Sequence, residues 1–338
     1  MILAGDIGGT NARLALFERR DRGRIGPPRA LEELLPHEFA TFEDLLAAYR
    51  KRHPEPVEIA SFGVAGPPVD GKVWGTNLAW DIDTRPASRL LGAPAHLIND
   101  LEATGYGIPA LTDADLETLQ EGVPHPHGNA GIVAAGTGLG ESLLARVGED
   151  LIPVASEAGH ADFAPRTDDE IELFQLLRER FGRVSWERVL SGPGFALIAE
   201  WLHARDGAAG PGAAAWGRHV EEAGEHGLPA LVSHAGLGGT CLWCTRALEQ
   251  FVSIYGAEAG NVALRGVTRA GLYVAGGIAP RILPALRRPG FLAAFRDKEP
   301  HTKLLAEIPV RMIRNELAGM LGAARYATLV AAGDGSPL

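Results

Sequence analysis

The sequence predicts an α/β protein in two parts with mixed sheets, and three observations support this fold class. Apolar strands at 2–6 and 13–17 flank the glycine turn GGTN at 8–11, a pattern typical of a β-hairpin. The stretch GIVAAGTGLGESLLARV at 131–147 repeats the order of strand, glycine turn and strand, as a weak internal repeat. Helical patterns dominate after this second hairpin. Because a purely parallel sheet contains no hairpins, we expect the sheets to be mixed.

Further elements follow from apolar runs and from capping residues. The stretch 168–181 is expected to be a helix, because Thr167 and Glu170 form a capping box at its start and Gly182 follows its end. The other expected elements are strands at 57–65, 95–98 and 272–275, a hairpin at 71–77, helices at 192–205, 241–255 and 313–331, and a flexible connection at 206–217.

Length and charge limit the classes of partner. The 338 residues suffice for about two domains. The formal net charge of −10 argues against nucleic acid or an anionic membrane surface as the main partner. Backbone amides can still bind phosphate groups without any net positive charge.

The N-terminus does not resemble a signal peptide and no apolar run is long enough to span a bilayer, so we expect a soluble, cytoplasmic protein.

The stretch GDIGGTNARLAL at 5–16 contains the first candidate phosphate site. It has no lysine, as a Walker loop requires, and a strand rather than a helix follows the glycines. A tight hairpin alone is the simpler interpretation. Asp6 favours a site, because a carboxylate beside a glycine turn can contact Mg²⁺ through water while the amides face phosphate oxygens. The candidate ligands on the turn are Gly8, Gly9, Thr10 and Asn11.

Two more glycine segments strengthen the phosphate hypothesis. Gly136, Thr137 and Gly138 lie in the turn of the second hairpin, and Gly276 and Gly277 follow an apolar strand. Glycine lets the backbone approach a ligand closely. Together, the segments could hold β- and γ-phosphates from opposite sides and leave space for a nucleoside.

The pair Asn99–Asp100 ends a buried strand where an apolar residue would be routine. One interpretation makes Asp100 a helix cap, because a carboxylate can accept bonds from the free amides at a helix start. The alternative makes Asp100 a general base that accepts a hydroxyl proton, with Asn99 fixing that hydroxyl.

A further set of polar residues follows the second hairpin. In SEAGH, Glu157 and His160 lie three residues apart around a glycine turn, and Glu187 begins a helix. Taken singly, each is better explained as a cap or a surface residue. Carboxylates, an amide and an imidazole together are what polyol recognition requires, since adjacent hydroxyls need paired donors and acceptors.

Eight motifs in a fixed order carry a resemblance to a known family. They are DIGGTN, GVAGPPVDG, TNLAW, LINDLEATGYG, AAGTGLG, SEAGH, ERVLSGPG and VAGGIAPR. In this order they resemble the bacterial ATP-dependent glucokinases of the hexokinase–actin-like ATPase superfamily. The matches run from residue 2 to about 326 and so cover nearly the whole chain.

The resemblance implies a role for each candidate residue. Asp100 is similar to the family's catalytic base and Asn99 to its sugar-binding neighbour. The glucose-hydroxyl ligands correspond to Glu157, His160 and Glu187. The nucleotide ligands correspond to Asp6 (which reaches Mg²⁺ through water), Gly8, Gly9, Thr10 and Asn11 in the first loop, Gly136, Thr137 and Gly138 in the second, and Gly276 and Gly277 at the adenosine. Asn77 and Trp80 resemble the loop that borders the sugar.

The resemblance also implies an architecture and a reaction. The fold would be actin-like (ribonuclease H-like), with a cleft between a small domain, 1–108 completed by a C-terminal helix at 312–332, and a large domain, 109–311. The expected reaction transfers the γ-phosphate of MgATP to the 6-hydroxyl of glucose, giving glucose 6-phosphate and ADP, the first step of glycolysis. The family implies a homodimer. A kinase for mannose or fructose, or a sugar-sensing regulator, are the alternatives.

One departure from related sugar kinases concerns zinc. The repressor–kinase (ROK) relatives carry a cysteine-rich zinc motif soon after the glycine-histidine pair, but GHADFAPRTDDE contains no cysteine. Cys241 and Cys244 lie in an apolar helical run and are interpreted as core or free thiols, so no zinc is expected. The basic loop at 19–29 is expected to be a solvated excursion rather than a partner site, and the sequence assigns it no function.

Overall fold

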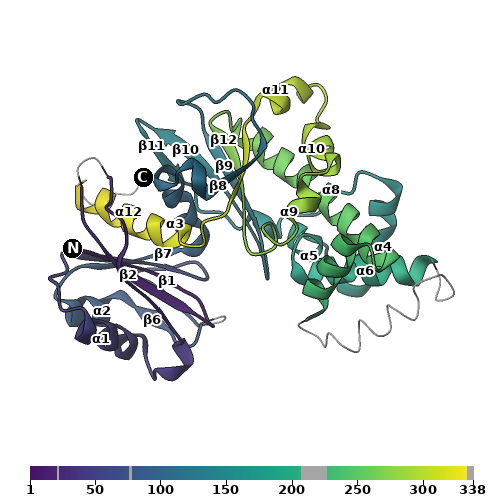
Figure 1. The fold of residues 1–338 in the computed structure, drawn as a ribbon. Coiled ribbons are helices and arrows are strands. Elements are labelled where there is room, and N and C mark those ends of the chain that lie inside the picture. Colours follow the sequence, from purple (N-terminus) through teal and green to yellow (C-terminus); the bar gives the residue numbers. More distant parts are fainter. Residues whose placement is uncertain (21–22, 76–77, 207–226, 333–338) are drawn as a thin grey trace. The chain divides into compact units, whose positions relative to one another are not determined.

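The computed structural model describes residues 1–20, 23–75, 78–206 and 227–332 (Figure 1). Contacts within the chain divide it into two compact units. Unit 1 contains Met1–Leu116, Val147–Val154 and the residues from Asn315 onward, and unit 2 contains Glu117–Arg146 and Ala155–Arg314. Each unit has a hydrophobic core of its own. Within the described ranges, no helix has both the length and the apolar character needed to cross a membrane.

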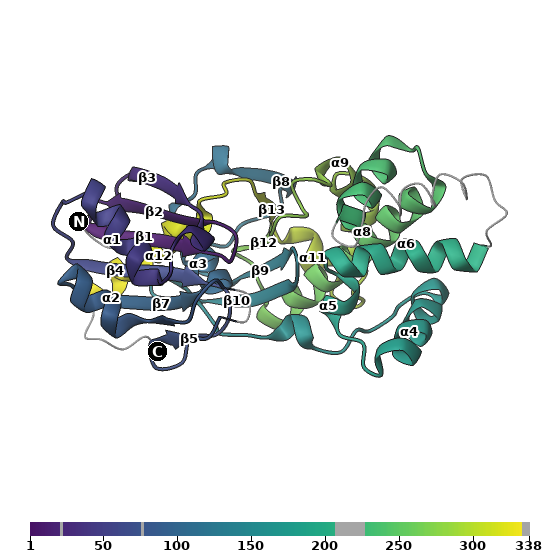
Figure 2. The same cartoon turned by 90° about the horizontal axis from the view of Figure 1, so that it is seen from below.

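The sheet of unit 1 is mixed, as the sequence predicts. Its strands lie in the order β3 (Arg29–Leu34), β2 (Ala12–Phe17), β1 (Ile2–Ile7), β4 (Ile59–Val64) and β7 (Ala95–Asn99) (Figure 2). Strand β1 is antiparallel to β2 and parallel to β4, which is parallel to β7. The carboxyl ends of the three parallel strands therefore share one edge, where Ile7, Val64 and Asn99 are neighbours.

Helices cover both faces of this sheet (Figure 1). One face carries α1 (Phe42–Arg52) and α2 (Thr84–Leu91), and the other carries α3 (Asp100–Gly107) and α12 (Ala318–Ala332). The division follows strand alternation, because Leu3 packs in one core with Phe42 while Ile2 packs in the other with Ala323. The short elements of unit 1 are η1 (Pro36–Glu38), β5 (Lys72–Val73), β6 (Ile82–Asp83), η2 (Ile108–Ala110) and η3 (Asp113–Asp115).

Glycines let the backbones of α3 and α12 touch. A Cβ at Gly322 would lie 1.6 Å from the carbonyl oxygen of Ala103, and a Cβ at Gly107 would lie 2.2 Å from that of Ala318. Neither position tolerates a side chain without moving a helix. This contact therefore sets where α3 begins on the sheet.

The C-terminal helix begins later than the sequence predicts. The helix expected at 313–331, within the segment 312–332 assigned to the small domain, starts only at Ala318, and Val310–Ile313 form strand β13. The apolar residues of β13 are buried because the strand pairs with a central strand of the second sheet. The Asn315 side chain accepts a bond from the amide of Leu317 at 2.8 Å, which separates strand from helix.

The second sheet has six strands, and it contains the predicted second hairpin. Their order is β11 (Asp150–Pro153), β10 (Leu139–Val147), β9 (Ala130–Ala135), β12 (Gly271–Ala275), β13 and β8 (Leu116–Gln120) (Figure 2). Strands β9 and β10 are antiparallel, with Ala135 opposite Leu139, and β12 is parallel to β9. The strand expected at 272–275 is thus confirmed.

The helices of unit 2 include α4 (Asp168–Phe181), α5 (Trp186–Val189), α6 (Gly192–Asp206), α8 (Leu242–Gly266), α9 (Leu283–Leu286), α10 (Pro289–Arg296) and α11 (Thr302–Glu307), with a 3₁₀ turn η4 (Ala158–His160). Residues 227–238 are helical as well. The predicted cap of α4 is confirmed, because the Thr167 side chain accepts a bond from the amide of Glu170. The Glu170 carboxylate does not complete the predicted capping box, because it accepts hydrogen bonds from the amide and the side chain of Arg166. The connection expected at 206–217 lies outside the described residues from 207 onward.

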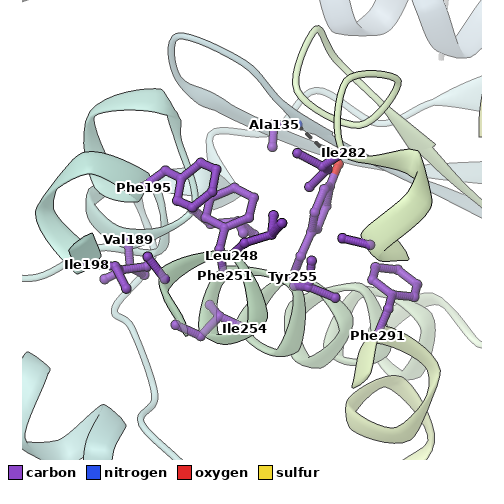
Figure 3. Packing of buried hydrophobic residues seen from close by; sticks show 14 of the residues in the cluster. Ala135, Val189, Phe195, Ile198, Leu248, Phe251, Ile254, Tyr255, Ile282 and Phe291 are labelled. Carbon is purple, nitrogen blue, oxygen red and sulfur yellow. Dashed lines mark hydrogen bonds between the residues drawn. The ribbon is translucent and has the colours of Figure 1, made fainter. Parts of the chain in front are cut away.

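Helix α8 is longer than the expected helix at 241–255. It continues to Gly266 because Gly256 and Gly260 face α10, where Cβ atoms would lie 2.1 and 2.5 Å from the carbonyl oxygens of Phe291 and Phe295. These glycines are contact points between helices and do not end α8. Figure 3 shows the neighbouring core, in which the rings of Phe195 and Phe251 stack 4.6 Å apart.

Candidate active site

Asp6 lies on β1 next to the carboxyl edge of the sheet in unit 1. Its Oδ2 is 3.7 Å from the position that a Cβ would take at Gly319 on α12. The pKa of Asp6 is raised to about 6, first because burial removes water from the carboxylate and second because of the Asp100 charge, whereas Arg13 opposes the rise. Arg13 is itself held by Glu33 and Glu316, each at 3.0 Å.

The turn predicted as the first phosphate loop directly follows β1. The amide of Gly8 donates to the carbonyl oxygen of Asn11 at 2.9 Å, which closes the hairpin. Gly9, Thr10 and Asn11 are exposed. The four residues therefore form a tight turn that begins two residues after Asp6, and its outer residues face solvent.

The pair Asn99–Asp100 joins β7 to α3. Asn99 is the cap, because its Oδ1 accepts bonds from the amides of Leu101 (2.9 Å) and Glu102 (3.3 Å). Its Nδ2 donates to the carbonyl oxygen of Gly66 at 3.3 Å. Asp100 follows as the first residue of the helix, so Asn99 and not Asp100 occupies the N-cap position. The base hypothesis stays a prediction.

Asp100 is exposed, and its position depends on a glycine that sequence reasoning missed. Its Oδ1 accepts a bond from the amide of Leu101 at 2.8 Å. A Cβ at Gly63 on β4 would lie 3.9 Å from the Cα of Asp100 and only 2.9 Å from the Cβ of Ala103. Because Gly63 has no side chain, α3 begins directly against the sheet, and Asp100 is fixed by backbone packing.

Two of the predicted glycine segments meet in unit 2. Gly136 donates to Gly138 at 2.8 Å and accepts a bond from the amide of Gly192 at 2.8 Å. Gly276 has a φ of +84°, and a Cβ there would lie 2.3 Å from the carbonyl oxygen of Ala135. The amide nitrogen of Gly277 is 3.9 Å from the Cβ position of Gly136. The structure therefore brings the second loop and the candidate adenosine segment together, with Thr137 exposed.

Tyr255 on α8 positions these two segments and was missed by sequence reasoning. Its buried hydroxyl lies 3.2 Å from the carbonyl oxygen of Val133 and 3.1 Å from that of Ala275, and it accepts a bond from the amide of Ala135 (Figure 3). It thus ties together the ends of β9 and β12. An isolated tyrosine in an apolar helix gives no sequence signal for this role.

Glu187 and His160, two of the predicted sugar ligands, also lie side by side in unit 2. Oε2 of Glu187 accepts a bond from the amide of Leu139 at 3.0 Å, and Oε1 lies 3.7 Å from Nδ1 of His160. Glu187 therefore contacts both the second phosphate loop and the SEAGH turn. As predicted, it lies in the first turn of a helix, α5, which Ser185 caps.

The SEAGH turn depends on its glycine. Gly159 lies against β10, where a Cβ would be 2.0 Å from the carbonyl oxygen of Leu139. The carbonyl oxygen of Glu157 accepts a bond from the amide of His160 at 3.0 Å, which makes the expected turn. The side chains of Glu157 and His160 are both exposed, so the turn presents a carboxylate and an imidazole from one packed segment.

Other candidates have structural roles in the described chain. Trp80 donates from Nε1 to the carbonyl oxygen of Phe39 at 2.8 Å and packs against Phe42, while Asn77 lies outside the described residues. Cys241 and Cys244 are buried free thiols, as predicted, and Cys241 Sγ accepts a bond from the amide of Cys244 at the start of α8. In the ranges described, no group of three histidine, cysteine, aspartate or glutamate side chains could hold a metal ion.

Comparisons with known proteins agree with this fold and this set of motifs. The family described as Glucokinase matches residues 3–330. The glucokinase of Nostoc punctiforme is 40% identical over 339 residues, covering 96% of this chain and 98% of that protein. The solved structure of a glucokinase from an Antarctic psychrotroph is 28% identical with a TM-score of 0.84, covering 96% of this chain and 98% of that one.

A more distant structure shows the fold alone. The ROK family glucokinase from Streptomyces griseus, in complex with glucose and AMPPNP, has a TM-score of 0.64 at 19% identity and covers 97% of this chain and 99% of that one. The family match and the fold shared with the psychrotroph structure place the chain among the sugar kinases with the actin-like fold. The chain belongs to the glucokinase family and is an ATP-dependent hexose kinase.

Proposed function

We infer that this enzyme transfers the γ-phosphoryl group of ATP to the 6-hydroxyl of glucose, with Asp100 as the general base. The observation that carries this assignment is the position of Asp100, an exposed carboxylate at the first residue of α3 and next to the edge where β1, β4 and β7 end. Backbone packing at Gly63 and the Asn99 cap hold it there. A base on a rigid element can orient the hydroxyl as well as accept its proton.

We propose that Glu157, His160 and Glu187 bind the sugar hydroxyls, with Asn99 as a further sugar ligand. Two exposed side chains from the SEAGH turn and the partly exposed Glu187 supply both donors and acceptors. Oε2 of Glu187 is already bonded to the amide of Leu139, so Oε1 is the oxygen we assign to the sugar. Through this carboxylate, the sugar ligands and the second phosphate loop would keep a fixed spacing.

We propose that the glycine segments bind ATP. The turn at Gly8–Asn11 and the loop at Gly136–Gly138 would face the phosphates, and Gly276 and Gly277 would lie along the adenosine. Backbone amides at such glycines can approach phosphate oxygens closely. The bond network around Tyr255 supports this proposal, because it fixes two of the three segments relative to each other.

The residues around Asp6 fit a Mg²⁺ ion bound through water. The raised pKa of Asp6 reflects burial first and the repulsion between the Asp6 and Asp100 charges second. Carboxylate oxygens are the ligands that Mg²⁺ prefers, and a divalent cation would offset the repulsion. When bound, the ion would neutralise charge on the transferred phosphoryl group. The Asp6 carboxylate would accept a hydrogen bond from a water molecule bound to the Mg²⁺ ion, and Arg13 would help to keep Asp6 ionised.

Several expectations from the sequence stay predictions. These are the homodimer, the cytoplasmic location, the absence of zinc, and the two domains at 1–108 with 312–332 and at 109–311. Sedimentation of the purified protein would measure the oligomeric state, and metal analysis would measure the zinc content. Limited proteolysis would map the domain boundaries.

A substrate panel tests the proposed reaction. ADP release from MgATP is measured with glucose, mannose, fructose, N-acetylglucosamine and no sugar, and the product is identified as a 6-phosphate. We expect strong stimulation by glucose. Preference for another hexose would keep the mechanism and change the substrate. ATP turnover that ignores every sugar would contradict the proposed function.

A further inference from the structure

A cavity of about 830 Å³ lies in unit 1, apart from every residue predicted to bind sugar or nucleotide. Its walls come from the β2–β3 connection, from the segment around Pro109 in η2, and from α12. For the basic loop at 19–29, the sequence favours a solvated excursion over a partner site and assigns no function. The described part of that loop instead forms one side of a cavity.

The lining of this cavity is strongly positive. Of the eleven lining residues that the structure describes, four are arginines, namely Arg19, Arg20, Arg24 and Arg325, and the other seven carry no charge. Such a concentration is unusual in a chain with a formal net charge of −10. The nearby carboxylate of Glu18 is bonded to Arg29, outside the cavity, at 2.7 Å. A concave surface with one sign of charge attracts ligands of the opposite sign.

Arg325 contributes a buried guanidinium group to the wall of this cavity. Only 7% of this residue is exposed, and its Nη2 bonds to Asp150. Its Nη1 is buried and has no hydrogen-bond partner among the residues that the structure describes. A buried guanidinium group with an unused donor is costly unless an acceptor is supplied. A bound anion is one way to supply it.

The remaining lining residues and the size of the cavity define the class of ligand. The two N–H groups of an arginine guanidinium can bond to two oxygens of one phosphate group, and several arginines together favour a ligand with more than one negative charge. Ile25, Pro109 and Leu321 provide an apolar wall, which suits the carbon skeleton of an organic phosphate. The volume is within the range of small-molecule sites. We propose that this cavity binds a phosphorylated small molecule with at least two anionic charges.

Calorimetric titration of the full-length protein tests this proposal without glucose or ATP. The probes are fructose 1,6-bisphosphate, a sugar bisphosphate, and pyrophosphate, which has the charge without the carbon skeleton. The decisive variant is Arg20→Gln with Arg24→Gln, because both side chains are exposed and their loss leaves the core intact. The matched control is Lys51→Gln with Arg89→Gln, which removes two exposed charges from α1 and α2 of the same unit.

We expect the double arginine variant to bind about ten-fold more weakly or worse, and the control to stay within about two-fold of the unmodified protein. Tighter binding of the sugar bisphosphate would identify an organic phosphate as the ligand, and equal binding would assign recognition to the phosphate groups alone. Arg325→Lys keeps the positive charge but removes the guanidinium group that can bond to two phosphate oxygens. This variant should also bind the probes more weakly. The proposal is overturned if neither probe gives saturable binding, or if the double arginine variant binds like its control.

Discussion

The glycine turn at Gly8–Asn11 and the glycine loop at Gly136–Gly138 both join two antiparallel strands, but different contacts support them. The first turn is closed by one backbone bond, and its outer residues are exposed. The second is held from three directions, by Gly192, by Glu187 and by the hydroxyl of Tyr255 at the end of β9. Similar local sequences therefore form two hairpins that are supported by different contacts.

The comparison shows that different kinds of contact position the candidate site residues in the two units. In unit 1, close backbone packing of α3 against β4 and α12 positions Asp100, while the turn after β1 is closed by one backbone bond. In unit 2, side chains from α5 and α8 brace the loop directly. We therefore expect backbone substitutions to be most damaging in unit 1, and side-chain substitutions to be most informative in unit 2.

The largest effect is expected for Gly322→Ala. The added methyl group would lie 1.6 Å from the carbonyl oxygen of Ala103, so α12 must move away from α3. We expect a loss of at least about 3 kcal/mol in the free energy of unfolding, measured by urea denaturation. Gly319→Ala on the same helix is the control, because its nearest atoms would be 3.7 Å away. Equal stability of the two variants would contradict the packing argument.

The next effect concerns pH and stability at Asp6. The pKa of Asp6 rises from 3.8 to about 6 in the folded protein, so its ionisation opposes folding. This cost is absent below about pH 4, grows as the pH rises to about 6, and is complete above that. Asp6→Asn should therefore stabilise the protein at pH 7 by up to about 3 kcal/mol, and hardly at all at pH 4, while activity falls. Urea denaturation at both pH values checks this, and a variant less stable at pH 7 would contradict it.

Tyr255→Phe probes the support of the second loop. It removes a fully buried hydroxyl that lies within bonding distance of Val133 and Ala275. We expect a loss of about 1–2 kcal/mol in unfolding free energy and a several-fold higher KM for ATP, with the KM for glucose unchanged. Tyr273→Phe on β12 serves as the control. A change confined to stability would leave Tyr255 without a positioning role.

Effects on kinetics without a large loss of stability distinguish the two sugar carboxylates. Glu157 is exposed, and its carboxylate makes no contact with the second loop among the bonds described. Glu157→Gln should therefore raise the KM for glucose about ten-fold and leave the KM for ATP unchanged. Glu187→Ala removes the acceptor of the Leu139 amide as well, so both KM values should rise. Steady-state kinetics with each substrate varied in turn checks this. Identical patterns would refute the proposed link between sugar and loop.

Local chemistry explains which parts the sequence could predict. Both hairpins, the α4 cap and the strand before Gly276 depend on neighbouring residues, and all are confirmed. The sequence missed contacts between distant segments, such as the Tyr255 hydroxyl on β9 and the Leu139 amide on Glu187. It also placed the end of α8 too early and began the C-terminal helix at residue 313, the last residue of β13, because glycine spacing and short apolar runs do not reveal a packing partner.

The most direct test of the proposed mechanism is Asp100→Asn, measured for both turnover and glucose binding. Asparagine keeps the bond to the Leu101 amide and cannot accept the hydroxyl proton. Asp168→Asn, at the equivalent first position of α4, is the matched control. We predict that turnover falls by at least about a hundred-fold in Asp100→Asn while calorimetry still detects glucose binding, and that Asp168→Asn is unaffected. Near-normal turnover in Asp100→Asn would contradict the assignment of Asp100 as the base.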